Sequence, residues 1–205
     1  NCPNWLPITF QINRGEWFNP QEVEVLDFHR QLDFQTGVLR RRMIVRDQEG
    51  HQTLIQSWRL ASMAHPNLAG IRYQVTPLNY ARTLSVRSEL DGTVINQGVK
   101  RYQELSSRHL DPLLEEGQDE VSLLAVQTNQ SGIVIAEAAR LTVMSGEDIV
   151  HPEFFIAANP GKITTTFEVE VRSDRPMVLD KIVSIHASHL SEGADPESWR
   201  ETPVP

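Results

Sequence analysis

Hydrophobic and polar residues alternate along most of this chain with a period of two. The clearest run is ITTTFEVEVRS, where Ile163, Thr165, Phe167, Val169 and Val171 fall on one side and threonines and glutamates on the other. Such alternation is typical of an extended strand with one buried face. Nine comparable runs, rich in β-branched residues, cover residues 23–34, 38–47, 53–63, 68–79, 82–90, 121–128, 133–143, 163–173 and 177–188. The pattern predicts a mostly β chain with little helix.

Turn residues separate several of these runs. Gly37 and Gly50 close the segments QTG and DQEG, Gly92 follows Asp91, and Gly161 ends the segment NPG. Glycine adopts the positive φ that tight turns require, so each of the four is expected to supply it. We therefore expect consecutive strands to pair as antiparallel hairpins.

Two segments break the alternation. Residues 101–120 lose the period of two, and could hold a short helix or a long excursion before the next strand. Residues 192–205 form a polar, proline-rich tail in which Asp195, Pro196 and Glu197 can begin a helix.

Three consecutive arginines, Arg40 to Arg42, raise the question of a nucleic-acid site. Alternation splits them between two faces: Arg41 shares its side with Leu39, Met43 and Val45, whereas Arg40, Arg42 and Arg46 lie opposite with Ile44. The chain carries 19 Lys and Arg against 27 Asp and Glu, a net charge of −8, which repels a polyanion. We expect a solvated stripe of charge on one strand, paired with carboxylates, and no nucleic-acid partner.

Composition narrows the class of protein further. With 205 residues and 40% hydrophobic content, the chain can bury the core of one sizeable domain or of a cramped pair. Its one cysteine, Cys2, allows neither an intrachain disulfide nor a cysteine-based zinc site. No run is long and apolar enough to cross a bilayer, and the N-terminal segment lacks the features of a secretory signal. These features favour a cytoplasmic protein.

Motifs for catalysis or metal binding are weak. The one close histidine pair, His186 and His189, would point to opposite faces of a strand, so no metal site is predicted. No nucleophile elbow, phosphate-binding glycine loop or zinc-protease motif occurs, and the many carboxylates cannot be paired by spacing alone. Residues 96–110 gather basic, aromatic and amide side chains on an expected loop, which is either a binding region or an ordinary surface excursion.

Several segments carry a resemblance to a known family. They are PNWLPITF, EVLDFHRQLDFQTGVLRRRMIVRD, RLASMAHPNLAGIRYQVTPLN, SELDGTVINQGVKRYQ followed by RHLDPL, QTNQSGIVIAEAAR, and LDKIVSIHAS. In order and spacing, from Pro3 to about Ser188, the chain resembles the N-terminal domain of glycoside hydrolase family 65, which includes maltose, trehalose and kojibiose phosphorylases.

The resemblance implies a fold and a place in a larger protein. The fold would be an antiparallel two-sheet super-sandwich of the galactose mutarotase-like class. Residues 1–190 would form the N-terminal sandwich, lacking its first strands and a glycine-rich LGNGYLG-like pattern, and residues 191–205 would begin the linker to an absent (α/α)6 catalytic barrel.

The resemblance also implies a function. The parent enzyme would cleave an α-glucosidic disaccharide by inverting phosphorolysis to β-glucose 1-phosphate, with inorganic phosphate as co-substrate and no other cofactor. This chain would be its non-catalytic sandwich domain, inactive alone, with its own barrel as partner and the possibility of a homodimer. We expect the loop bearing Arg101, Tyr102, Arg108 and His109 to form the domain-docking or pocket-facing edge.

Two alternatives remain at this point. The sandwich could be a free-standing carbohydrate-binding module or aldose epimerase, which needs a concave face with a histidine and a carboxylate near a sugar ring. It could also be a pure assembly domain. Neither the disaccharide linkage nor the choice between phosphorolysis and hydrolysis is encoded in these residues.

Overall fold

The computed structural model describes residues 2–95 and 108–189. In these ranges the chain forms strands and no helix, so no helix that could span a membrane occurs there. The strands are β1 (Ile8–Ile12), β2 (Glu24–Asp33), β3 (Val38–Arg46), β4 (Gln52–Ala61), β5 (Leu68–Pro77), β6 (Arg82–Asp91), β7 (Leu110–Gln118), β8 (Val121–Thr128), β9 (Ile133–Ser145), β10 (Asp148–Val150), β11 (Phe155–Asn159), β12 (Lys162–Val171) and β13 (Met177–His189). The nine runs predicted from the pattern all form strands.

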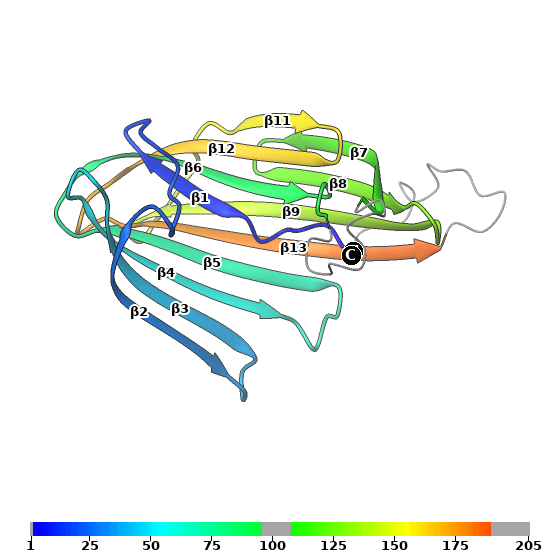
Figure 1. Ribbon diagram of the computed structural model, residues 1–205, viewed down its shortest axis with the longest axis horizontal. Coiled ribbons are helices and arrows are strands. Elements are labelled where there is room, and N and C mark those ends of the chain that lie inside the picture. Colours follow the sequence, from blue (N-terminus) through cyan, green and yellow to red (C-terminus); the bar gives the residue numbers. More distant parts are fainter. Residues whose placement is uncertain (1, 96–107, 190–205) are drawn as a thin grey trace.

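The strands build two antiparallel sheets that face each other. The smaller sheet has the order β1-β6-β12-β11, and the larger runs β2-β3-β4-β5-β13-β9-β8-β7, with β10 also paired to β9. Figure 1 shows the smaller sheet lying over β9, β13 and their neighbours, while β2, β3 and β4 spread away from it. The predicted two-sheet antiparallel sandwich is confirmed.

The core lies between the sheets and follows the predicted alternation. Phe167 and Leu84 from the smaller sheet are fully buried, as are Ile55, Val75 and Leu179 from the larger one. Glu168 and Glu170, which alternate with the buried residues of β12, are exposed. Each strand therefore contributes one apolar face to a shared interior.

Three of the four predicted glycine turns are confirmed. Gly37, Gly50 and Gly161 have φ values of 69°, 84° and 78°, and each joins two paired strands.

The prediction for Gly92 was wrong, because its φ is not positive and β6 pairs with β1 and β12 rather than with the next strand. Its N–H donates to the carbonyl of Gly161 at 2.7 Å, and a Cβ there would lie 2.7 Å from Cγ1 of Val126. Close approach of backbone explains this glycine, not turn conformation.

Four strands were not predicted from the pattern: β1, β7, β10 and β11. The expected helix or excursion over 101–120 is wrong for residues 110–118, which form β7; residues 101–107 lie outside the described ranges. Strand β7 contains Pro112 and a register irregularity between Pro112 and Leu114 opposite β8, which removes the regular alternation.

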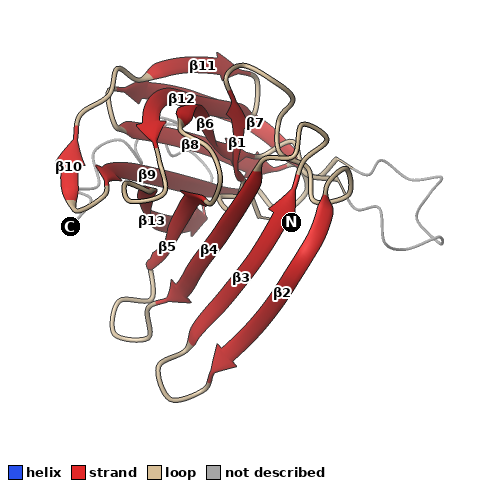
Figure 2. Ribbon diagram, turned by 90° about the vertical axis from the view of Figure 1, so that its left-hand side faces the viewer, coloured by secondary structure: helices blue, strands red, loops and turns tan. Residues whose placement is uncertain are grey.

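The strands β2, β3 and β4 form what we call the wing. Figure 2 shows these three strands running away from the smaller sheet. Met43, Val45 and Ile55 are buried at one end of the wing, but β2 is exposed along nearly its whole length. On the side that faces the smaller sheet, called the inner face, Phe28 and Leu32 are 55% and 47% exposed. The larger sheet thus extends beyond its covering layer.

Candidate functional site

Two of the three arginines on the outer face of the wing are paired with carboxylates, as the sequence predicted. Arg42 contacts Asp27 across the β2–β3 pair, and Arg46 Nη1 lies 2.9 Å from Glu24 Oε2. All four side chains are about half exposed, so these contacts add little stability. Their role is to neutralise a solvated stripe of charge.

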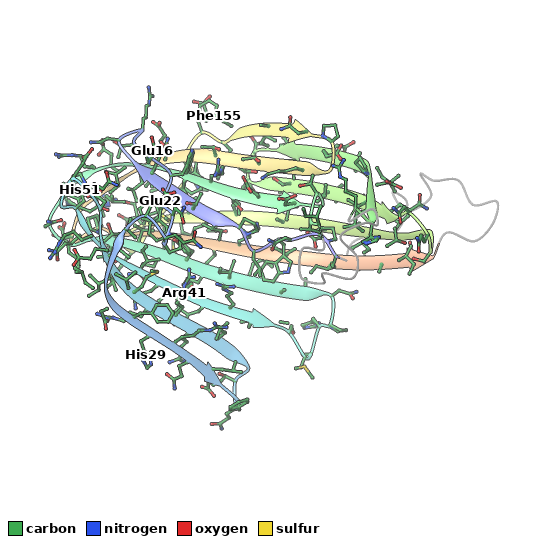
Figure 3. All side chains as sticks on the ribbon, in the orientation of Figure 1. Glu16, Glu22, His29, Arg41, His51 and Phe155 are labelled. Atoms are coloured by element: carbon green, nitrogen blue, oxygen red, sulfur yellow. The ribbon has the colours of Figure 1, made fainter. Side chains whose placement is uncertain are left out.

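Arginines on the inner face are arranged differently. Arg30 lies directly opposite Arg41 across β2 and β3, and Arg41 lies opposite Ser57 on β4. Arg59 is two residues beyond Ser57 and therefore diagonal to Arg41 on the same face. Figure 3 shows Arg41 on the side of the wing toward the smaller sheet and His29 on the opposite side. We call Arg30, Arg41 and Arg59 the inner arginines.

No carboxylate balances the inner arginines in the part of the chain that the structure describes. None of the three has an ion pair there, and the Nε of Arg41 is buried without a hydrogen-bond partner. Burial lowers the pKa of Arg59, and the neighbouring charges of Arg41 and Arg30 lower it further. The inner face thus concentrates positive charge within a protein of net charge −8.

A second group of ionisable side chains is sealed inside the sandwich. Glu137 on β9 and Lys181 on β13 are both 0% exposed. Lys181 Nζ donates to the backbone carbonyl of Glu89 at 2.7 Å, whereas Oε2 of Glu137 has no partner and Cys2 Sγ lies 3.8 Å from Oε1. Because these groups have no access to solvent, a substrate cannot reach them.

Burial dominates the titration of this pair. Loss of hydration raises the pKa of Glu137 to about 7, against the smaller opposing effects of Lys181 and Cys2. The same loss lowers the pKa of Lys181 to about 7, against the attraction of Glu137 and Glu89. Perturbed pKa values often mark catalytic groups, but here they follow from enclosure.

An end pocket of about 220 Å³ opens where the 13–23 segment folds back over β1 and β4. Trp17, Glu16 and Glu22 line it together with His51. His51 is held in place, because Nδ1 lies 2.9 Å from Asp47 Oδ2 and its ring packs edge-on against Tyr80. Figure 3 shows Glu16, Glu22 and His51 at the same end of the molecule. Aromatic rings beside carboxylates and a histidine can hold a polar ring such as a sugar.

Two of the four residues expected at the docking edge can be placed. Arg108 forms an isolated bridge with Ile95 just before β7, and His109 follows it. The side-chain amide of Asn129 donates to the Arg108 carbonyl at 3.1 Å, and its backbone N–H donates to that of His109 at 3.1 Å. Arg108 and His109 are therefore anchored beside the β8–β9 turn. Arg101 and Tyr102 lie outside the described residues.

The histidine pair considered from the sequence lies on β13. His186 Nε2 is 2.9 Å from the hydroxyl of Ser184, and its Nδ1 is 3.4 Å from the amide of Asn67. These contacts occupy both nitrogens of His186. In the described residues no group of three or more His, Cys, Asp or Glu side chains could hold a metal ion.

Comparison with known proteins identifies the family. Residues 1–201 match the model of the "Glycosyl hydrolase family 65, N-terminal domain". The chain belongs to this family. An uncharacterized glycosyl hydrolase of Mycobacterium tuberculosis is 36% identical over 188 residues, which are 92% of this chain and 14% of that protein. A kojibiose phosphorylase of Caldanaerobacter subterraneus subsp. tengcongensis is 31% identical over 193 residues, 92% of this chain and 25% of the enzyme.

The family 65 assignment agrees with the fold. A solved structure titled as a putative kojibiose phosphorylase from human microbiome superposes with a TM-score of 0.80 at 15% identity. The match covers 98% of this chain and 24% of that chain. This family 65 domain therefore spans about a quarter or less of the length of these relatives.

Sequence reasoning missed the inner arginines as a group, the Glu137–Lys181 pair and the end pocket. One signal was visible, since Arg41 shares its alternation face with Leu39, Met43 and Val45. The register across the β2–β3 and β3–β4 hairpins places Arg30 and Arg59 beside Arg41. This register depends on the geometry of the turns and cannot be read from alternation within one strand.

Proposed function

We propose that this chain is the non-catalytic N-terminal sandwich domain of a longer family 65 enzyme that acts on an α-glucosidic disaccharide. The match of residues 1–201 to the N-terminal domain of the family carries this proposal. It is supported by length, because the chain covers only 14% to 25% of the relatives described above. The catalytic residues would then belong to a barrel outside these 205 residues.

The reaction of the longer enzyme is inverting phosphorolysis to β-glucose 1-phosphate. Relatives named kojibiose phosphorylase support this choice over hydrolysis. In such a reaction a general acid protonates the departing oxygen while inorganic phosphate attacks the anomeric carbon directly. Phosphate is the co-substrate, and it needs no carboxylate base because it is already an anion.

The domain packs against its own barrel, and the edge with Arg101, Tyr102, Arg108 and His109 is its pocket-facing or docking side. Support comes from Arg108 and His109, whose backbone is fixed by Asn129 beside a turn. A homodimer is compatible with this role. The absence of a disulfide framework, with Cys2 as the one cysteine, favours the cytoplasm.

A second candidate function is carbohydrate binding by the domain itself, at the end pocket. The favouring observation is the combination of Trp17, Glu22 and the oriented His51–Asp47 pair around a space of about 220 Å³. One face of the Trp17 ring is already engaged in an internal contact, because the Arg87 guanidinium stacks over it at 4.2 Å. The scaffold function is therefore preferred.

Titration calorimetry separates the two functions. The chain is titrated with glucose, maltose, trehalose, kojibiose and nigerose, and we expect no saturable heat with any of them. Saturable binding that is lost in His51→Ala and kept in His29→Ala, a histidine on the outer face of the wing, would establish the binding module instead. Sedimentation on the same samples reports self-association, which would indicate an assembly domain if calorimetry is silent.

A further inference from the structure

The inner arginines form a compact cationic group on adjacent strands. Arg30 and Arg41 are direct cross-strand neighbours, a position at which like charges destabilise a sheet. Arg59 adds a third guanidinium on the same face. Without a counter-charge, this arrangement costs folding free energy that an alternation of arginine and carboxylate would avoid.

The same surface holds buried polar atoms without partners. Ser57 is 1% exposed, and its hydroxyl oxygen has no hydrogen bond. It lies opposite Arg41, whose Nε is also buried and unpaired. Buried polar atoms are nearly always satisfied in native proteins, so two neighbouring exceptions on one face indicate a missing partner.

The chemistry of the group defines that partner. Each guanidinium offers only N–H donors in a planar fork, and the serine hydroxyl can donate as well. A partner must therefore supply several acceptor oxygens and negative charge, which is what a carboxylate or a phosphate provides. Phe28 and Leu32 lie on either side of Arg30 along β2, on the same face, and are 55% and 47% exposed.

We propose that Arg30, Arg41 and Arg59, with Ser57, form an oxoanion-binding site on the inner face of the wing. The site is separate from the docking edge at Arg108 and His109 and does not depend on the proposed function of the domain. The oxoanion comes either from a free ion such as phosphate or from a carboxylate side chain of a polypeptide segment. Arg42 and Arg46 on the outer face do not belong to the site, because Asp27 and Glu24 already neutralise them.

The test compares thermal unfolding of the 205-residue chain in sodium chloride and in sodium phosphate or sodium acetate at equal ionic strength. We expect a saturable rise in Tm of about 3 °C at anion concentrations well above Kd. Arg41→Met and Arg59→Met should each abolish this rise. Arg40→Met, on the same strand but the opposite face, should keep it.

The Arg41→Met and Arg59→Met variants also keep the proposal falsifiable in sodium chloride, where no oxoanion is added. Removing one of three like charges should leave Tm in chloride unchanged or higher, whereas an arginine that only packs the sheet should lower it. The proposal would be overturned if both variants had a lower Tm than the parent chain in chloride and if phosphate and acetate did not raise the Tm of the parent chain.

A peptide arm distinguishes the two sources of the oxoanion. A capped peptide with one glutamate between leucines is titrated into the chain, with its glutamine counterpart as control. Binding of the glutamate peptide alone, lost in Arg41→Met, assigns the site to a polypeptide carboxylate. Binding of phosphate without the peptide assigns it to a free ion. Binding of neither overturns the site.

Discussion

At the scale of single residues, Glu137 and Lys181 show how enclosure alone changes ionisation. Neither side chain is exposed to solvent. In the part of the chain that the structure describes, no ion pair within 4 Å joins Glu137 to Lys181. A lone charge buried in an apolar interior is costly, so each group is shifted toward its neutral form. Both shifts make folding stability depend on pH, in opposite directions.

For Glu137 the sign is fixed by its raised pKa. Between the ordinary carboxyl pKa of 4.5 and the folded value of about 7, the folded chain holds a proton that the unfolded chain has released. Stability contributed by this proton is complete below pH 4.5 and is lost as pH rises toward 7. Lys181 contributes the reverse, with stability that is complete above 10.5 and is lost as pH falls toward about 7.

Glu137→Gln tests this account. In this variant the side chain at position 137 cannot titrate. The free energy of unfolding of the parent chain minus that of the variant should therefore fall from pH 5 to pH 7, by no more than about 1.4 kcal/mol per pH unit. Urea unfolding at several pH values measures the difference. Glu168→Gln, at an exposed site of β12, is the matched control for the loss of a carboxylate. A difference that stays flat or grows with pH would contradict the raised pKa.

At the scale of elements, regular alternation was sufficient to predict strands, and its interruption explains the misses. The run from Ile163 to Val171 places every second residue in the core, so β12 could be predicted from sequence alone. Strand β7 could not, because Pro112 and the irregular register before Leu114 break the period. Strands β10 and β11 are too short to display a pattern over several residues.

The close approach at Gly92 gives a prediction for the contact between the sheets. Gly92→Ala should lower the free energy of unfolding by about 1–3 kcal/mol, because the new methyl group would lie 2.7 Å from Val126 Cγ1. Denaturant unfolding measures the cost. The Gly92→Ala/Val126→Ala double variant should lose less free energy of unfolding than the sum of the losses of the two single variants, because Val126→Ala removes the clashing atom. Strict additivity would show that the methyl group meets no such obstacle.

At the scale of the whole molecule, the nine-stranded sheet and the four-stranded sheet do not match in width. The order of the strands leaves the wing without a second layer in the described residues, with Phe28 and Leu32 exposed beside the inner arginines. A local pattern reports which side chains share a face, but not whether that face is covered, because coverage depends on segments far away in the chain. For this reason the sequence predicted a site only on the loop that bears Arg108 and His109. The uncovered inner face of the wing became visible only in the structure.

The length of the relatives completes this picture. The chain matches the N-terminal domain of family 65 throughout residues 1–201 and yet spans about a quarter of the kojibiose phosphorylases. Glu137 and Lys181, two groups with strongly perturbed pKa values, are closed to substrate. The two observations are consistent with the proposed function, in which this domain is a scaffold and the reacting groups belong to a longer protein.

Phosphorus NMR of the products tests that claim most directly. The 205-residue chain and the longer protein that is proposed to contain it and a catalytic barrel are each mixed with inorganic phosphate and with maltose, trehalose, kojibiose or nigerose. Our account predicts β-glucose 1-phosphate from the longer protein with one of the disaccharides, and none from the 205-residue chain. Glucose 1-phosphate released by the 205-residue chain alone would contradict it.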